Sequence, residues 1–337
     1  QPNGGSHLCA CYAHECRPAP EPQGAYLNPV TALKAVAHPC AAASVNAWVM
    51  FICLLLFISL GMGVTTARAQ SRVTDDRGVT SQWTIAPQRV ITLLPSLTES
   101  VCALGQCTRL VGIDRYSNWP DQVKILPTLG GGMDPNIEAI LSLKPDVVFA
   151  AQSSRVAERL EALGLKVVAL ETTSHSDVQR LLSKVSQALG VAPEHAKQLW
   201  QSIDDGVSAA AQQLPVSTQQ LRVYIEVNRA PFGAGARSFI GETLTRLGAQ
   251  NILQAQPDAF PRINPEFVLR AQPDLIMVSE RDMTSMLERP GWSSMAAIKN
   301  NRICAFAPAE QDVLVRPGPR LAEAAHIMAN CLKRFSS

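Results

Sequence analysis

The sequence predicts an α/β protein made of two similar lobes of alternating strands and helices, each with a mainly parallel sheet, joined by one long rigid helix. The first observation is a repeat: the segment Asn136–Asp146 (NIEAILSLKPD) returns as Asn264–Asp274 (NPEFVLRAQPD). Each copy runs into an apolar strand, so the repeated unit is a helix followed by a strand. The second observation is a helical pattern from Pro193 to about Leu214 with no strand on either side, which predicts the connecting helix.

Both copies of the repeat carry helix start and stop signals. The Asn of each copy can accept a hydrogen bond from an early backbone N–H, and the closing Pro ends the helix. Glu138 and Glu266 then lie in the first turn, where the helix dipole favours a negative charge. The repeat is therefore explained locally as two capped helices.

Strands alternate with helices on both sides of the connecting helix, which is typical of βα units and a parallel sheet. The expected strands are 89–94, 109–113, 147–150, 166–170, 222–227, 275–278 and 303–307. Residues 95–99 are expected to form a turn that leads into a short helix ending at 104–105. The other expected helices are 155–163, 175–190, 240–247 and 319–335, in addition to the two repeat copies. The predicted organisation is a leader and signal peptide (1–69), an N-terminal linker (70–87), an N-terminal lobe (88–190), an inter-lobe backbone helix (191–215) and a C-terminal lobe (216–337).

The leader has the composition of a secretory signal. No charged residue occurs between Lys34 and Arg68, and Ala47–Leu60 is almost wholly apolar but short for a membrane span. An A-x-A site then predicts cleavage near Ala69, leaving Gln70 first; because a lipoprotein needs Cys there, we expect a soluble, exported protein that is not a lipoprotein. An uncleaved membrane anchor is the alternative.

Charge and motif content narrow the function. The 337 residues carry 30 Lys+Arg and 28 Asp+Glu, a net charge of +2, without a long basic run, which argues against nucleic-acid binding. His175, His195 and His326 stand in separate predicted helices, which argues against a site for bare Zn²⁺ or Mn²⁺. The sequence has no nucleophile elbow, phosphate loop or zinc-protease motif, so we expect no enzymatic activity. A hydrolase using Ser96, or a structural protein that has lost transport, are the remaining alternatives.

Four cysteines follow the leader. In an exported protein they can form disulfides, and we prefer the pairs Cys102–Cys107 and Cys304–Cys331. Buried free thiols are the equal alternative.

The order and spacing of several motifs over residues 88–335 resemble the cobalamin and iron-siderophore class of periplasmic binding proteins. The motifs are RVITLLPSLTE, LVGIDRYSNWP, NIEAILSLKPDVV, LGLKVV, APF at 230–232, GAQNIL at 248–253 and PEFVLRAQPD. The resemblance is greatest to the cobalamin-binding members. It implies a class III periplasmic binding protein, a helical backbone metal receptor that serves an ABC importer. We therefore expect a monomer in the periplasm that captures a small molecule and has no intrinsic cofactor.

The resemblance also assigns a role to the repeated glutamates. In this family a Glu on each lobe meets arginines of the permease dimer in the inner membrane, and Glu138 and Glu266 occupy those positions. Two exposed carboxylates, one per lobe, suit a two-fold partner, since exposed charges fix orientation more than they add affinity.

The ligand is expected in the cleft between the lobes, beyond the carboxyl ends of the strands. Tyr116 aligns with a ligand-stacking Tyr of the cobalamin binders, Phe260 with a wall-forming Trp, and Asp312 and Arg316 with a cleft Asp and Arg. Arg316 could pair with an acidic group of the ligand. The complete set of candidate ligand residues is Ser96, Leu97, Thr98, Tyr116, Gly131, Gly132, Gln152, Asn228, Phe232, Phe260, Asp312 and Arg316.

The sequence departs from the cobalamin pattern at two aromatic positions. Gly130-Gly131-Gly132 stands where one aromatic is expected, and Ala151-Gln152 where the other is. The Tyr that haem binders of this class place near the Gly-rich loop is absent. The expected ligand is therefore cobalamin or a related cobalt corrinoid, with a ferric siderophore or haem, both iron chelates, as the alternative.

Overall fold

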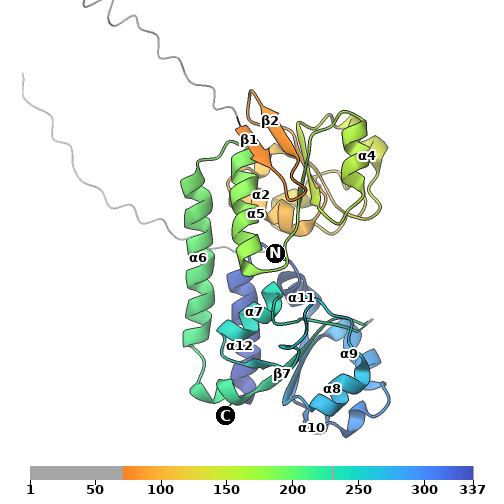
Figure 1. Cartoon of the computed structure of the whole chain (residues 1–337), viewed down its shortest axis with the longest axis vertical. Coiled ribbons are helices and arrows are strands. Elements are labelled where there is room, and N and C mark those ends of the chain that lie inside the picture. Colours follow the sequence, from red (N-terminus) through yellow and green to blue (C-terminus); the bar gives the residue numbers. More distant parts are fainter. Residues whose placement is uncertain (1–70, 230, 337) are drawn as a thin grey trace, which may run out of the picture. The chain divides into compact units, whose positions relative to one another are not determined.

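The computed structural model describes residues 71–229 and 231–336. The predicted leader, signal peptide and cleavage site lie outside them. The described chain contains two mainly parallel sheets with helices packed on them, as the sequence predicted (Figure 1).

The first sheet has four parallel strands in the order β4-β3-β5-β6. Its strands are β3 (Val90–Thr92), β4 (Leu110–Ile113), β5 (Val147–Ala151) and β6 (Val167–Leu170), and its helices are α2 (Pro95–Ala103), α3 (Ile137–Ser142) and α4 (Val156–Ala162), with 3-10 turns at Cys107–Arg109 and Asp121–Ile125. The strands are almost wholly buried because helices cover the sheet, which is why they read as continuous apolar runs.

The second sheet has the order β11-β10-β7-β8, with β9 also on β7; only β8 is antiparallel. Its strands are β7 (Arg222–Asn228), β8 (Phe232–Gly233), β9 (Gln250–Asn251), β10 (Leu275–Ser279) and β11 (Ile303–Phe306). Its helices are α7 (Phe239–Arg246), α8 (Pro265–Ala271), α9 (Glu280–Leu287), α10 (Ala296–Lys299), α11 (Pro308–Leu314) and α12 (Leu321–Phe335), with 3-10 turns at Val216–Gln220 and Trp292–Ser294.

The two copies of the repeat adopt the same local structure. The side chains of Asn136 and Asn264 cap α3 and α8, accepting from the N–H of Ala139 (3.0 Å) and Glu266 (2.9 Å). In each copy the residue before the Pro takes the left-handed conformation that terminates many helices: Lys144 has φ 45° and Gln272 has φ 44°.

The closing Asp of each copy then holds the start of the first strand of its own sheet. Asp146 accepts from the N–H of Arg89 (2.9 Å), and Asp274 from that of Arg222 (2.9 Å). Each Asp also donates its own N–H to the carbonyl of the same arginine, at 2.8 Å in both cases. The Asn, Pro and Asp that the two copies share therefore cap the helix, end it and hold the start of the neighbouring strand in place.

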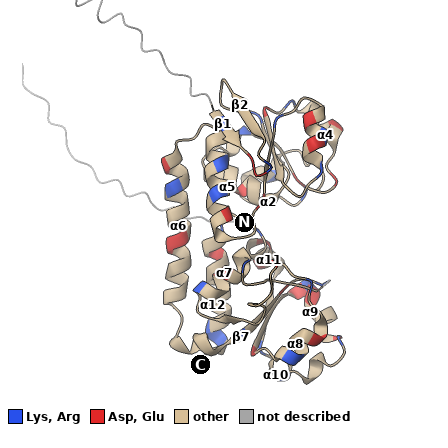
Figure 2. Ribbon diagram, viewed as in Figure 1, with Lys and Arg blue, Asp and Glu red and all other residues tan. Residues whose placement is uncertain are grey.

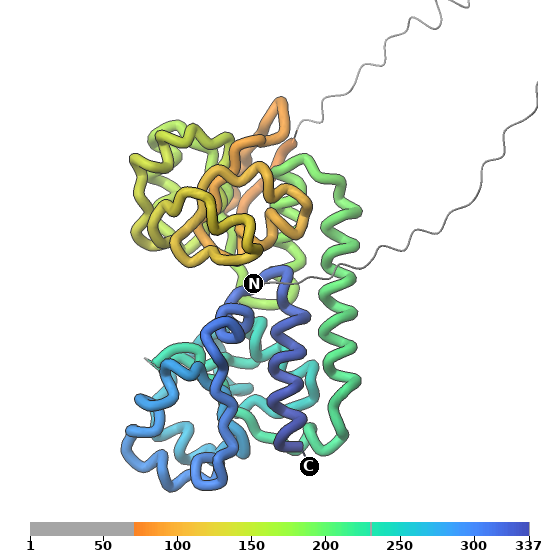
Figure 3. Tube along the Cα trace, turned by 180° about the vertical axis from the view of Figure 1, so that it is seen from behind, coloured from red at the N-terminus to blue at the C-terminus, as the bar shows by residue number. Residues whose placement is uncertain are grey.

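Helices α5 (His175–Ala188) and α6 (Pro193–Gln212) connect the two sheets. The long helix α6 packs against α5 and against the C-terminal α12, which lies beside it in both views (Figures 1 and 3). A Cβ at Gly206 would lie 2.6 Å from the Cβ of Ala322, so the close contact of α6 with α12 requires a glycine there.

Two disulfides are present. Cys102–Cys107 joins the end of α2 to the turn that follows, and Cys304–Cys331 joins β11 to α12. Each bond therefore ties a helix to its neighbour within one half of the described chain.

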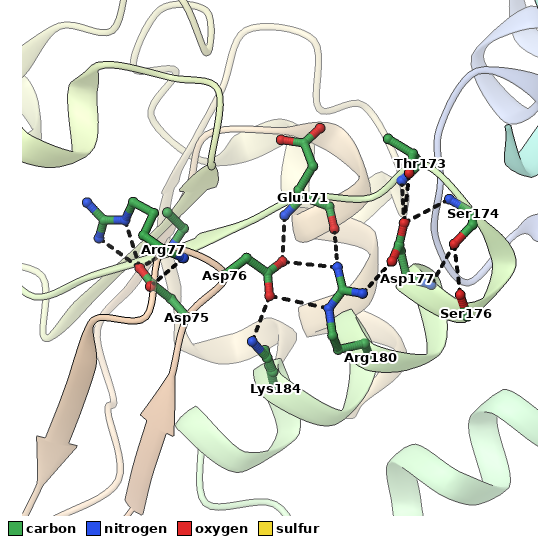
Figure 4. Close-up of polar contacts among 11 residues, drawn as sticks. Asp75, Asp76, Arg77, Glu171, Thr173, Ser174, Ser176, Asp177, Arg180 and Lys184 are labelled. Atoms are coloured by element: carbon green, nitrogen blue, oxygen red, sulfur yellow. Dashed lines mark hydrogen bonds and ion pairs between the residues drawn. The ribbon is translucent and has the colours of Figure 1, made fainter. Parts of the chain in front are cut away.

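The residues expected to form an N-terminal linker instead form a hairpin of β1 (Ser71–Thr74) and β2 (Thr80–Trp83). Its turn is held to β6 and α5 by a polar network (Figure 4). Asp76 accepts from Lys184 Nζ (2.6 Å), from Arg180 Nη2 (3.2 Å) and from the N–H of Glu171 (2.8 Å). Burial alone would raise the pKa of Asp76, but these donors outweigh it and lower that pKa below its ordinary value. The two strands of the hairpin were not predicted from the sequence because they are short and polar.

His175, at the first turn of α5, links this half of the chain to α7. Its N–H donates to Glu242 Oε2 (2.6 Å), and its Nε2 lies 3.0 Å from the carbonyl of Phe239 and 2.9 Å from Thr243 Oγ1. Burial lowers the pKa of His175, and the nearby Arg246 guanidinium lowers it further, against the opposing effects of the Phe239 carbonyl and of Asp204.

We expect this histidine to make the free energy of unfolding fall on acidification. The unfolded chain binds a proton near pH 6.5, whereas folded His175 stays neutral to lower pH, so stability is lost as pH falls below about 6.5. Chemical denaturation at pH 7.5, 6.5, 5.5 and 5.0 should show a steeper loss in the wild type than in His175→Gln. Parallel pH profiles for the two proteins would contradict the assignment.

Candidate functional site

A cavity of about 290 Å³ opens at the carboxyl end of β7 and is lined by aromatic and aliphatic side chains. It brings together three of the predicted ligand residues, Asn228, Phe232 and Phe260, with Phe239, Ile240, Val227 and Val315. Phe239 and Phe260 pack edge to face, with ring centroids 5.7 Å apart. An apolar pocket with one amide suits the flat face of an organic ring system better than a small polar solute.

The other four residues that line the cavity were not predicted from the sequence. Phe239 and Ile240 begin α7 directly after its cap Ser238, so they resemble ordinary core positions of an amphipathic helix. Val315 follows α11 and keeps 36% of its surface exposed, which the sequence does not signal.

The Tyr116 loop, at the carboxyl end of β4, is a second candidate wall of the ligand site. Tyr116 is 61% exposed, more than any other aromatic side chain in the described part of the chain. A Cβ at Gly131 would lie 3.4 Å from its ring and 2.6 Å from Asp134 Oδ1, and Gly130 has φ +90°. The glycines that replace the expected aromatic thus allow a tight turn on which the Tyr116 ring rests. Gly132 continues this turn, and a Cβ there would lie 2.9 Å from the Leu93 carbonyl.

The Tyr116 loop is anchored from below by buried polar groups. Asp114 accepts from the N–H of Tyr116 (2.9 Å) and from the hydroxyl of Ser117. Ser117 in turn bonds Thr98 (2.7 Å), which also bonds Thr92 (2.6 Å). Burial raises the pKa of Asp114, although its hydrogen bonds and Arg316 act in the opposite direction.

The structure therefore does not support the predicted role of Ser96, Leu97 and Thr98 as ligand-contacting residues. Leu97 and Thr98 are 1% and 0% exposed, so their side chains lie in the core and offer no surface to a ligand. Thr98 holds the ligand-side loop in place instead. Ser96 is also buried, against Gly318, whereas Gln152 is exposed at the end of β5.

Arg316 is the largest departure from expectation. It is 6% exposed and both of its terminal nitrogens are engaged: Nη1 donates to Glu99 Oε1 (2.9 Å) and to Asn118 Oδ1 (2.8 Å), and Nη2 donates to the Tyr116 carbonyl (3.1 Å). Asp312 pairs with the same guanidinium at 2.7 Å. The side chain expected to meet an acidic ligand group instead joins the segment after α11 to α2 and to the Tyr116 loop.

Glu99 is the centre of this ion-pair cluster. Its side chain is 1% exposed and accepts from Arg320 as well, with Nη2 3.1 Å from Oε1 and Nε 3.2 Å from Oε2. The Arg320 guanidinium also stacks over Trp119 at 4.9 Å. Val315 lines the cavity and the next residue, Arg316, donates to the Tyr116 carbonyl, so the cluster ties the Tyr116 loop to a segment that lines the cavity.

The two repeated glutamates lie exposed on α3 and α8, in the first turn of each helix. Glu266 makes only a long contact with Arg270, at 3.8 Å, while both side chains remain more than 70% exposed. Acidic and basic residues are interspersed along the described helices rather than segregated (Figure 2).

Within the described residues there is no group of three or more His, Cys, Asp or Glu side chains that could hold a metal ion. The same part of the chain has no helix that is both long and apolar enough to cross a membrane.

Comparison with known proteins identifies the family. A family model described as periplasmic binding protein matches residues 90–309. The chain belongs to the periplasmic binding protein family. Its fold is that of class III members, and its role is that of the substrate-binding component of an ABC importer, as the sequence resemblance implied.

Individual relatives differ in what they bind. The chain is 29% identical over 263 residues (73% of this chain, 80% of the relative) to the uncharacterized ABC transporter substrate-binding lipoprotein YvrC of Bacillus subtilis (strain 168). It is 27% identical over 258 residues (75% and 93%) to the vitamin B12-binding protein of Salmonella choleraesuis (strain SC-B67). Among solved structures, the periplasmic heme-binding protein BhuT in complex with two hemes is 26% identical, with a TM-score of 0.63 over 74% of this chain and 99% of that one.

One expectation is wrong in light of these relatives: that the protein is not a lipoprotein. The Bacillus subtilis relative is a substrate-binding lipoprotein. The expectation rested on the single residue Gln70 at an assumed cleavage site, and the residue that begins a processed chain changes with the site of processing.

We expect Glu99→Gln to lower the free energy of unfolding by about 3 kcal/mol, since it leaves two buried guanidinium groups without their shared carboxylate. The matched control is Glu323→Gln, which removes a half-exposed carboxylate 3.7 Å from the same Arg320. Its effect should stay within about 0.5 kcal/mol. Urea unfolding measures both values, and equal effects would show that the buried cluster has no special weight.

Proposed function

We propose that this ABC-importer component captures cobalamin or a related corrinoid. The observation that carries the proposal is the aromatic cavity with Asn228 in its lining, together with the exposed Tyr116 on the loop that Arg316 holds. A corrin ring presents a broad face for aromatic contact and a periphery of amides that can bond an amide side chain. The relatives named vitamin B12-binding proteins support the same choice.

The positive and negative charges of the Glu99 cluster balance one another. This balance also favours a ligand whose ring edge is uncharged. Both terminal nitrogens of Arg316 are already bonded, to Glu99, Asp312 and Asn118, so its two-nitrogen fork is not open to an acidic group at this position. An isolated ligand carboxylate placed there would have to compete with buried ion pairs already formed.

A ferric siderophore or haem is the second candidate, supported by the similarity to a haem-binding protein of the same fold. We propose no chemical step for any of these ligands.

Titration of residues 71–337 with cyanocobalamin, ferrichrome and haem separates the candidates. Trp119, 38% exposed next to the Tyr116 loop, should report binding through its fluorescence, with calorimetry as the second readout. We expect cyanocobalamin to bind most tightly. Phe232→Ala should weaken its binding about tenfold, because a lost aromatic contact contributes on the order of 1–1.5 kcal/mol.

Val216→Ala is the control for Phe232→Ala, since it removes a 78% exposed aliphatic side chain that does not line the cavity. If cyanocobalamin fails to bind while haem or ferrichrome binds, the corrinoid assignment is wrong. If Phe232→Ala matches the control, the cavity is not the site.

We further propose that Glu138 and Glu266 dock the protein on basic groups of the permease. Glu138→Arg with Glu266→Arg should leave ligand affinity unchanged and reduce uptake at least tenfold, because each change replaces attraction by like-charge repulsion. Uptake of radiolabelled ligand in cells carrying the permease measures this. Glu194→Arg with Asp205→Arg, at exposed positions on α6, is the matched control, and equal uptake in the two double variants would rule out the docking role.

A further inference from the structure

A second groove, of about 350 Å³, lies between the start of α3 and the start of α4. Its walls include Met133 and Ile137 on one side and Ser153, Arg155 and Arg159 on the other. It lies on the same sheet edge as the Tyr116 loop but is distinct from the aromatic cavity, which the second sheet supplies.

Two unpaired positive charges distinguish this groove. Arg155 and Arg159 are exposed and one helical turn apart, and neither has a hydrogen-bond or ion-pair partner among residues 71–229 and 231–336. Like charges at this spacing destabilise a helix slightly. Asp134, the carboxylate in the groove wall, is already paired with Arg115 at 2.5 Å. The positive charges in the groove wall are therefore not balanced by its carboxylate.

The groove adjoins the ligand wall directly. Ser154 Oγ donates to the carbonyl of Gly132 (2.7 Å), so the loop after β5 is bonded to the turn that supports the Tyr116 ring. Met133 continues that turn into the groove, and Gln152 precedes Ser153 at its other wall.

We propose that this groove binds an anionic group of the transported ligand, a phosphate ester or a carboxylate, through Arg155 and Arg159. The proposal rests on the proposed function and adds a charged subsite to it. Guanidinium groups suit these anions because each can offer two parallel N–H donors.

The subsite belongs to one lobe alone. The helix that follows the corresponding strand of the second sheet, α9, starts with Glu280 and carries the buried Asp282 in its first turn. An anion would be repelled there, so the repeat does not extend to this feature.

The test pairs each ligand that carries the anionic group with a relative that lacks it. Cobinamide lacks the phosphate-bearing loop of cyanocobalamin, and haem dimethyl ester lacks the free carboxylates of haem. Arg155→Ala with Arg159→Ala should weaken binding of cyanocobalamin or haem roughly tenfold, the effect of a charge-assisted contact in a partly open site, while binding of the relative without the anionic group should change little. A loss with cyanocobalamin but not cobinamide assigns the phosphate, and a loss with haem but not its ester assigns the carboxylate.

The control removes the same two charges elsewhere. Lys197→Ala with Lys299→Ala changes exposed residues on α6 and α10 and should leave all four affinities unchanged. Arg155→Lys with Arg159→Lys should fall between wild type and the alanine variant, because charge remains but paired donors are lost.

A second arm needs no transported ligand. Millimolar pyrophosphate should raise the thermal unfolding midpoint of the wild type and of the control Lys197→Ala with Lys299→Ala. The rise should be smaller for Arg155→Ala with Arg159→Ala. Equal responses, together with unchanged ligand affinities, would overturn the proposal. If the alanine variant lost only uptake, the groove would face an acidic segment of the permease and the proposal would likewise be wrong. Absence of binding by all four ligands to the wild type, with a normal pyrophosphate response, would instead contradict the proposed function alone.

Discussion

The buried ion-pair cluster around Glu99 is the interaction on which the candidate site depends. One carboxylate on α2, which follows β3, pairs with two guanidinium groups that follow α11 in the second half of the chain, and Asp312 supplies the second negative charge. Two buried charges without a partner would be costly, so the lobes are held where these groups meet. The same arginine that binds Glu99 holds the carbonyl of Tyr116, and the ligand wall is therefore placed by a contact that involves no ligand.

A second contact between the two halves of the chain, here a backbone hydrogen bond, involves the other lobe's first helix. Glu242 on α7 accepts from the N–H of His175 at the start of α5. Each lobe thus extends a glutamate from its first helix toward the opposite half of the chain. Burial raises the pKa of Glu242, so this contact has an electrostatic cost that the backbone donor offsets only in part. Together with the packing of α6 on α12, these contacts restrict how far the lobes can move apart.

The sequence predicted the framework well because the framework obeys local rules. Caps, first-turn charges, helix-ending prolines and buried apolar strands are each read from a few adjacent residues, and the repeat shows them twice. The preferred disulfide pairs are also present, although buried free thiols were an equal alternative on the sequence alone. The hairpin at 71–83 escaped notice because its stability comes from Asp76 contacts with residues about a hundred positions away, which no local pattern reveals.

The candidate site was predicted only in part, for a related reason. Whether Arg316 faces a ligand or a carboxylate depends on Glu99, more than two hundred residues earlier in the chain. Thr98 likewise lies beside Ser96 in a plausible ligand loop, yet its hydroxyl bonds Ser117 in the core. Residue type and spacing identified the right segments, but side-chain direction is set by tertiary partners.

The contrast between the repeated and the unrepeated features separates scaffold from recognition. Asp146 and Asp274 do the same structural work in both lobes, and the left-handed residues before them match within a degree. The aromatic cavity belongs to one lobe, and the Tyr116 turn and the arginine groove to the other. A ligand that fills all three must be asymmetric, with an apolar face against the second sheet and a charged extension toward α4. A duplicated scaffold can thus read an unsymmetrical molecule, because recognition lies in the loops that the two lobes do not share.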